Sequence, residues 1–309
     1  MKIKRQKKTR MKKTLGEHIF IGTNATILAI SFLVTLYPII YVISASFSDP
    51  AAVSSGEMIL WPIRPSLDAY KFVLNYKEIW SGYANTIFYT FVGTLLNLAV
   101  TMPCAYALSR KDLHGRGFIM ALFMVTMYIG GGIIPNYLNV NSFGLVNTRT
   151  FLLINGLVSV YNMIVARTFF SSTIPWELQE AAFLDGCSNI KLFFKVILPL
   201  SAPITVVLAL YYGVGHWNQY MTPLIYLKDR AKFPLQLILR EILTMGNFNS
   251  DAVGGGFTAE EFEAMTSMAN MANQMKYAII VVSTAPMLAI YPWLQKYFQK
   301  GVMIGSVKG

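Results

Sequence analysis

Long apolar segments separated by short charged stretches form the main pattern along this chain. A transmembrane helix needs about 20 predominantly apolar residues, and six segments of roughly this length contain no Asp, Glu, Lys or Arg. They are Ile19–Ser48, Ile79–Ser109, Gly117–Thr148, Thr150–Ala166, Val196–Leu227 and Tyr277–Gln295. The pattern therefore predicts an all-α, polytopic membrane protein with six transmembrane helices.

The composition supports the same class. Of the 309 residues, 54% are hydrophobic and 13% are charged, whereas soluble domains contain about 45–50% apolar and about 25% charged residues. The fourth segment is the shortest. Arg149 and Arg167 bound it, and their long side chains could reach the two membrane interfaces.

The distribution of Lys and Arg predicts the orientation, because basic loops stay on the cytoplasmic side of a membrane. Residues 1–18 form a tail with eight basic residues, which we expect to be cytoplasmic. Six spans within 19–309 then place the C-terminus and the basic loop at 110–116 on the same side. The net charge of +11 is explained mainly by topology and by anionic lipid, and nucleic-acid binding by the tail is a weaker interpretation.

This topology leaves two long segments between spans. Residues 171–200 lie inside, between the fourth and fifth spans, and residues 227–276 form an external loop. In that loop, Thr258 followed by Glu261 is a capping-box pattern that predicts a short helix. The external loop is either a contact surface or a solvated connector, and the sequence favours neither.

No pattern of catalytic or metal-binding residues stands out. The two cysteines suggest no disulfide framework, and the three histidines lack the spacing of a zinc site or a catalytic dyad. Gly130–Gly132 lacks the Gly-Lys-Ser/Thr that completes a phosphate-binding loop. With Pro135, these glycines favour a kink or close helix contact. We therefore expect no metal and no cofactor in this chain, and no nucleotide hydrolysis by it.

The cytoplasmic segment contains a predicted helical hairpin, EAAFLDGCSNIKLFFKVILP. Pro175 suits a first helical position, Gly186 suits the left-handed conformation that ends a helix, and Ser188 or Asn189 can cap a second helix. Such a hairpin at the inner face could insert into a groove of a cytoplasmic partner. It could also be an amphipathic interfacial connector.

The same residues resemble the EAA motif of ABC importer permeases, in which EAA is followed after three residues by Gly and after nine more by I-x-L-P. The only departure is Val196, which replaces Ile. The resemblance extends to Trp217–Leu227 and to the terminal QKYFQKGVMIGSVKG, and it is strongest to the carbohydrate branch related to maltose-type transporters. The Gly130–Pro135 region and the terminal run look similar to the subgroup associated with complex oligosaccharides.

The resemblance implies an importer in a bacterial plasma membrane. A second permease subunit would form a heterodimer with this chain, and an extracellular solute-binding lipoprotein would deliver an oligosaccharide. Two cytoplasmic ABC ATPase subunits would bind ATP and Mg and dock on the hairpin, which would be rigidly joined to the fifth span at Pro199. The residues implied in coupling are Glu180, Ala181, Ala182, Asp185, Gly186, Leu198 and Pro199.

Candidates for the substrate path are polar and aromatic residues in the spans, because polar groups there tend to face a cavity. Each has a structural alternative, since Tyr and Trp form interfacial belts and Asn joins neighbouring helices. The candidates are Asn155, Tyr161, Asn162, His216, Trp217, Asn218 and Tyr220.

Three other classes are weighed against this interpretation. A secondary transporter fits poorly, because no duplicated half is evident and the spans contain no charged residue for ion coupling. A membrane enzyme would need clustered catalytic groups at one face. An ABC permease for another solute, such as peptides, amino acids or phosphonate, shares the EAA segment and is the main alternative.

Overall fold

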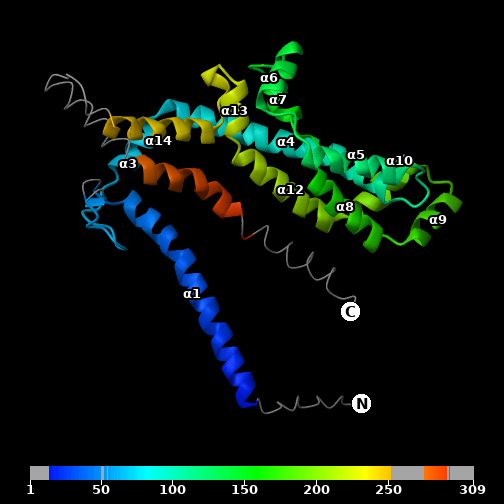
Figure 1. Ribbon diagram of the computed structural model, residues 1–309, viewed down its shortest axis with the longest axis horizontal. Coiled ribbons are helices and arrows are strands. Elements are labelled where there is room, and N and C mark those ends of the chain that lie inside the picture. Colours follow the sequence, from blue (N-terminus) through cyan, green and yellow to red (C-terminus); the bar gives the residue numbers. More distant parts are fainter. Residues whose placement is uncertain (1–13, 50–51, 54, 252–274, 291, 293–309) are drawn as a thin grey trace.

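The computed structural model describes residues 14–49, 52–53, 55–251, 275–290 and 292 (Figure 1). Every regular element in these ranges is a helix, and no strand occurs among them. The predicted all-α class is therefore confirmed for the described part of the chain.

Two long helices match the first two predicted spans. Helix α1 covers Leu15–Ser46, and a capping box fixes its start: Thr14 Oγ1 accepts a hydrogen bond from the Glu17 backbone N–H, and Glu17 Oε2 accepts one from the Thr14 backbone N–H. The helix projects away from the other elements (Figure 1). It buries only Ser44–Ser46 in its last turn, so its apolar surface is free to contact lipid or another subunit.

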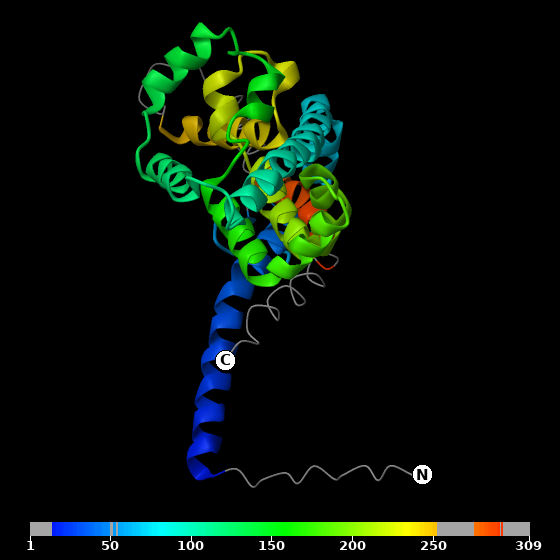
Figure 2. The same ribbon diagram turned by 90° about the vertical axis from the view of Figure 1, so that its right-hand side faces the viewer.

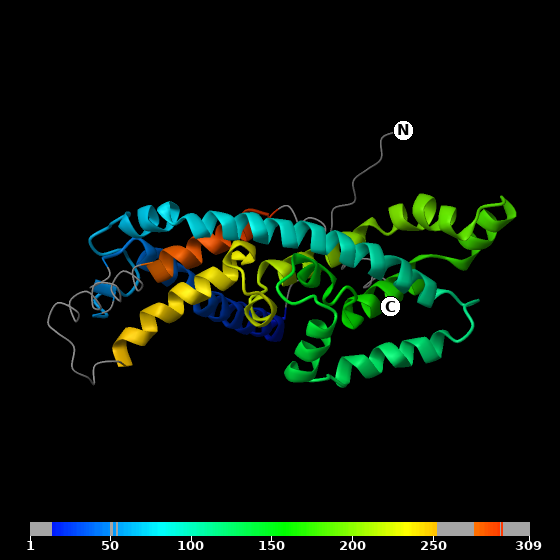
Figure 3. The ribbon, with the colours of Figure 1, turned by 90° about the horizontal axis from the view of Figure 1, so that it is seen from above.

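Helix α4, Lys77–Ser109, is the central element. It runs past α8 (Val160–Thr173), α12 (Ala202–Trp217) and α14 (Leu235–Asp251), and Figure 3 shows it along most of the molecule. One stripe of α4 is buried at steps of four residues, which is the spacing of a single helix face. The stripe consists of Asn85, Tyr89, Gly93, Asn97, Thr101 and Ala105.

The third predicted span is not one straight helix. It consists of α5 (Arg116–Tyr128) and α6 (Ile133–Ser142), which are bent by 114° relative to each other. These helices form a bent arm beside the bundle (Figure 2). The predicted kink at Gly130–Gly132 is confirmed, since Gly132 adopts φ = 79° before α6, a conformation that costs glycine little.

The fourth and fifth predicted spans are also interrupted. Helix α7 (Arg149–Ile154) and α8 are separated by residues 155–159. In the fifth segment, Asn189–Leu200 meets α12 at an angle of 81°, and α13 (Met221–Tyr226) follows as a separate helix. An apolar run shows that a segment tolerates lipid, but Gly, Pro and Ser within it allow backbone breaks that neighbouring helices stabilise.

These breaks affect the predicted number of spans. Among the described residues, two helices are long and apolar enough to cross a membrane, and up to four spans result if each bent pair counts as one. The helix Met275–Ile290 covers most of the sixth predicted segment.

The predicted external loop starts with regular structure. The 3₁₀ turn η2 (Arg230–Lys232) and α14 form its first part, and α14 packs on α4 through buried leucine and isoleucine side chains. The helix predicted from Thr258 lies outside the described residues. A short helix, α3 (Asp68–Asn75), contributes to the same core near the start of α4.

The apolar core is divided into two clusters along α4. One surrounds Ile79 and Tyr89 together with α3, α14 and the start of the helix Met275–Ile290. The other surrounds Met102 and Tyr106 together with α8 and the helices that follow the EAA segment. Between them, α4 carries Gly93 and Asn97, so a polar zone separates the two ends.

Candidate functional site

The EAA segment folds into the predicted helical hairpin. Helix α9 covers Trp176–Leu184 and ends at Asp185, and Gly186 follows with φ = 72°. The predicted left-handed conformation of Gly186 is therefore confirmed, and the Cys187 backbone N–H donates to the Ala182 carbonyl at 2.9 Å. Pro175 precedes α9 as its N-cap, one residue before the predicted position.

The second arm of the hairpin begins as predicted. Ser188 is the N-cap of α10 (Asn189–Leu192), and its Oγ accepts a hydrogen bond from the Lys191 backbone N–H. A π-helix, η1 (Phe193–Ile197), and α11 (Leu198–Leu200) follow. π-helical turns are rare in proteins, but where they occur they often lie at functional sites. The predicted residues Leu198 and Pro199 lie in α11.

The hairpin presents an exposed surface at one end of the molecule (Figure 1). Glu180, Ala181, Asp185 and Gly186 are exposed, while Ala182 is half-buried. Within the chain, Glu180 Oε1 accepts a hydrogen bond from Trp176 Nε1 at 2.6 Å. This bond orients the Glu180 carboxylate along α9.

Arg110, the residue that ends α4, joins the hairpin to the central helix. Its Nη1 donates to Asn189 Oδ1 at 2.7 Å and its Nε donates to Asp112 Oδ1 at 2.8 Å. Its guanidinium also lies 5.2 Å from the centre of the Phe183 ring and 6.0 Å from that of Trp176, within the range of cation–π attraction. The Arg110 side chain is only 11% exposed.

The ion pair with Asp112 stays charged at neutral pH. The hydrogen bond from Arg110 holds the pKa of the Asp112 carboxyl below its ordinary value. A carboxyl group with a lowered pKa contributes stability above its unfolded pKa of about 3.9, and this contribution is lost as the pH falls through the folded pKa. The Arg110 joint is therefore intact at physiological pH.

Further contacts attach the same end of α4 to its neighbours. The Tyr106 hydroxyl donates to Gln179 Oε1 of α9 at 3.4 Å, and the Tyr106 ring packs on Phe170 and Phe193. Arg167, whose predicted reach to a membrane interface stays a prediction, donates from Nε to the Leu108 carbonyl at 3.0 Å. None of these contacts was predicted, because each joins residues far apart in the sequence.

The predicted rigid joint between the hairpin and the fifth span at Pro199 stays a prediction, and the structure shows that this connection is bent. An 81° bend separates Asn189–Leu200 from α12, and Ser201 Oγ donates to the Ile197 carbonyl at the bend. Side-chain hydrogen bonds join α9 and α10 to Tyr106 and Arg110 at the end of α4, and Leu192 of α10 packs in the apolar cluster with α8 and α12.

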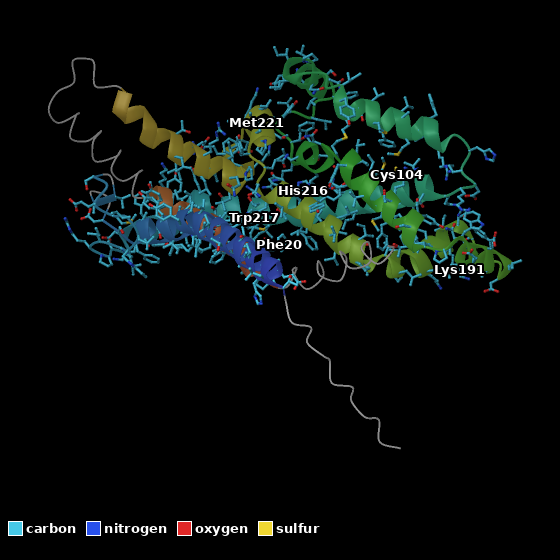
Figure 4. All side chains as sticks on the ribbon, turned by 60° about the horizontal axis from the view of Figure 1, so that its bottom comes forward. Phe20, Cys104, Lys191, His216, Trp217 and Met221 are labelled. Atoms are coloured by element: carbon cyan, nitrogen blue, oxygen red, sulfur yellow. The ribbon has the colours of Figure 1, made fainter. Side chains whose placement is uncertain are left out.

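A second group of polar residues joins the middle of α4 to α12. Helix α12 ends with His216 and Trp217, which are labelled in Figure 4. Asn97 Nδ2 donates to the Gly156 carbonyl at 3.0 Å and to the Leu157 carbonyl at 2.9 Å. His216 Nε2 lies 2.7 Å from Asn97 Oδ1. Asn97 thus satisfies backbone groups at the break between α7 and α8 and connects this break to α12.

The neighbouring hydroxyl groups complete this polar centre. Thr101 Oγ1 lies 2.7 Å from the Tyr212 hydroxyl oxygen, which accepts a hydrogen bond from the Ser159 backbone N–H. Sequence reasoning missed Asn97, Thr101 and Tyr212. An Asn inside an apolar span was the available signal, because such residues are costly in lipid unless they have partners.

The predicted substrate-path residues are distributed around this polar centre. Asn155 is exposed at the end of α7, beside the backbone that Asn97 binds, and Asn218 is exposed at the end of α12. Asn162 is buried in α8. Tyr161 is 56% exposed on that helix.

The aromatic candidates of the fifth segment have structural contacts. Trp217 is buried, and its Nε1 donates to the Ser283 carbonyl at 3.2 Å. Tyr220 lies beneath Arg240, with 4.4 Å between the guanidinium carbon and the ring centre.

The N-terminal half of α4 is also held by polar contacts. Asn85 Nδ2 donates to the Ala231 carbonyl at 2.8 Å and to the Phe233 carbonyl at 3.0 Å. Arg149, which the sequence placed at a membrane interface, donates from Nη2 to Asn85 Oδ1 at 2.9 Å. The segment before α14 is thereby fixed against α4 and α7.

The contact between α4 and α12 predicts that an alanine at Gly93 destabilises the protein much more than an alanine at Gly213. A Cβ at Gly93 would lie 2.5 Å from His216 Nε2, whereas a Cβ at Gly213 would lie 3.7 Å from Thr94 Oγ1. We expect Gly93→Ala to destabilise the protein by about 1–3 kcal/mol, the usual cost of overpacking, and Gly213→Ala to have little effect. Thermal unfolding of the purified protein measures both, and equal melting temperatures would contradict the packing described here.

Comparison with known proteins identifies the family. The family model described as the binding-protein-dependent transport system inner membrane component matches residues 79–304. The chain belongs to this family. It is therefore a transport permease subunit and not an enzyme, which confirms the predicted class over a secondary transporter or a membrane enzyme.

Relatives are similar over nearly their whole length. The polygalacturonan/rhamnogalacturonan transport system permease protein YtcP of Bacillus subtilis (strain 168) is 39% identical, over 90% of this chain and 94% of that protein. Protein LplC of the same organism is 36% identical, over 97% of this chain and 98% of that protein. A crystal structure of a bacterial ABC transporter involved in the import of the acidic polysaccharide alginate matches with a TM-score of 0.80 and 34% identity, covering 94% of this chain and 100% of that chain.

Proposed function

We propose that this chain is a permease subunit of an ATP-driven ABC importer that translocates oligosaccharides delivered by an extracellular solute-binding lipoprotein. The observation that carries the proposal is the near full-length similarity to permeases of polygalacturonan/rhamnogalacturonan and alginate transport systems. A permease for peptides or amino acids is not favoured, because the relatives with assigned substrates transport carbohydrates.

The proposed arrangement follows the charge pattern. Six spans cross a bacterial plasma membrane, and both termini and the hairpin at 171–200 lie in the cytoplasm. A second permease subunit completes the pathway and covers part of the exposed apolar surface of α1, α5 and α6. Two ABC ATPase subunits bind ATP and Mg and dock on the permeases.

The hairpin contacts support a mechanism of coupling. The exposed residues Glu180, Ala181, Asp185 and Gly186, with Ala182 behind them, contact a cleft of the ATPase. When the ATPase subunits close, α9 moves and carries Arg110 and the end of α4 with it. Because α4 contacts α8, α12 and α14, this displacement tilts the bundle between inward and outward access. The bend before α12 lets Leu198 and Pro199 move with the hairpin while α12 stays intact.

The substrate path is proposed to pass the polar centre. Asn155 is exposed beside the backbone that Asn97 binds, and Asn218 is exposed two residues after His216. Tyr161 and Tyr220 are the proposed aromatic contacts for sugar rings, Tyr220 together with the Arg240 that packs on it. Asn162 and Trp217 are buried, so they support these positions and hold the helices together.

The proposal is tested with the intact complex purified from native membranes. We expect an ABC ATPase and a second permease to copurify with the chain. Binding protein loaded with galacturonate oligosaccharides should stimulate ATP hydrolysis, and binding protein loaded with peptides should not. Absence of a copurified ATPase, or stimulation by peptides alone, would overturn the proposed function.

A further inference from the structure

A cavity of about 490 Å³ lies between the inner end of α4, the loop at 110–115 and the second arm of the hairpin. Its volume is within the range of ligand sites, roughly 300–1,000 Å³. The lining is mainly apolar. Its polar part is formed by Arg110, Asp112 and Asn189. The apolar lining side chains are Pro103, Ala107, Leu113, Ile190, Phe193 and Phe194.

The cavity runs along α4 into the membrane. Pro103 and Ala107 both line it, and Arg110 marks its end. A helix rises 1.5 Å per residue, so the lining extends about 10 Å from Arg110 to Pro103. A soluble ATPase subunit reaches the end of α4, whereas an acyl chain lies naturally alongside the helix within the bilayer.

The exposed apolar residues at the cavity point to the same occupant. Ile190 is 73% exposed and Phe194 is 59% exposed, although both line the cavity. Large apolar side chains at a membrane face are favourable where they contact lipid chains.

The charges next to the cavity select the headgroup. Arg110 is neutralised by Asp112, but Lys111 and Lys191 are exposed and adjoin the lining residues. Neither ammonium group forms an ion pair within the described part of the chain. Figure 4 shows Lys191 at the hairpin end of the molecule. Basic pockets between helices on the cytoplasmic side are suited to anionic lipid headgroups.

We propose that this cavity binds an anionic phospholipid of the inner leaflet, with an acyl chain along Pro103, Ala107 and Phe194 and the headgroup at Lys111 and Lys191. The inference rests on the cytoplasmic placement of the hairpin proposed above. Since Phe193 and Phe194 begin the π-helix, the lipid contacts the segment that leads from the hairpin to the bend before α12.

Lipid retention by the purified complex tests the proposal. We expect the wild-type complex, equilibrated with phosphatidylglycerol and then washed, to retain one more phosphatidylglycerol per copy of this chain than the Ala107→Leu variant, which fills the cavity. Ala99→Leu is the matched control, because Ala99 is exposed on the same helix and does not line the cavity. Native mass spectrometry counts the bound lipids.

The charge requirement is tested with two double variants. Lys111→Gln/Lys191→Gln should lose the same lipid, and Lys77→Gln/Lys228→Gln, which removes equal charge from exposed residues at the other end of α4, should retain it. Equal retention in all variants, equal retention of phosphatidylethanolamine by the wild type, or cross-linking of Ala107→Cys to the second permease would overturn the proposal. Sugar-stimulated ATPase activity of the same wild-type preparation separates failure of lipid binding from failure of the proposed function.

Discussion

Replacement of Gly186 by valine is expected to abolish most coupled uptake while the protein remains inserted in the membrane. Gly186 adopts φ = 72°, and an L-residue in this conformation costs about 1–2 kcal/mol, with β-branched residues affected most. This cost lowers the ratio of the correctly turned hairpin to its other conformations by a factor of roughly 5 to 30. Uptake of labelled oligosaccharide into proteoliposomes containing the whole complex measures the effect.

Gly186→Asn is the matched control. Asparagine tolerates the left-handed conformation better than other residues, and no atom lies within 4 Å of a Cβ at this position. If the turn itself is required, the Asn variant retains most uptake. Equal loss in both variants would mean that the ATPase surface accepts no side chain there, and full activity of the Val variant would contradict the role of the turn.

Replacement of Arg110 by alanine is expected to separate ATP hydrolysis from transport. The substitution removes the hydrogen bonds to Asn189 and Asp112, together with the ring contacts to α9. The hairpin then loses its charged attachment to α4 and keeps only the weaker Tyr106 contacts, so its movement displaces α4 less. We expect ATP hydrolysis to continue while uptake per ATP falls at least about tenfold, and a combined assay of phosphate release and uptake measures this ratio.

Two comparisons show whether Arg110→Ala acts by detaching the hairpin from α4 or by destabilising the whole protein. Arg64 forms exposed ion pairs with Asp49 and Glu57. Arg64→Ala should therefore leave uptake per ATP unchanged and alter the free energy of unfolding by no more than about 0.5 kcal/mol. A double-mutant cycle between Arg110→Ala and Asn189→Ala should give a coupling energy of about 0.5–3 kcal/mol. An unchanged ratio of uptake to hydrolysis in Arg110→Ala would exclude this residue as the joint.

The hairpin was predictable because its geometry is local. Gly186 ends α9 and Ser188 begins α10, and both roles depend on the residue's own backbone conformation and side chain. The contact between Arg110 and Asn189 joins residues 79 positions apart. No spacing rule connects such residues, so the attachment of the hairpin to α4 required the tertiary structure.

The interrupted spans also include one break that the local sequence predicts and one that depends on the tertiary structure. Gly130–Gly132 gave a local signal for the kink between α5 and α6. The break at 155–159 has no comparable signal, because it is stabilised from outside by Asn97, whose side chain binds the carbonyls of Gly156 and Leu157. Within a membrane, an apolar segment can leave the helical conformation only where its freed backbone groups find other hydrogen-bonding partners.

By itself, the sequence determined the membrane class and the turn of the EAA hairpin, because apolar length and glycine conformation act within short stretches of chain; the orientation rests on the charge pattern and stays a prediction. Only the tertiary structure decided which helix the hairpin is attached to, where the apolar segments break, and that a cavity lies beside Lys191. These features depend on contacts between segments distant in sequence, whose free energies are set by the geometry of the packed helices.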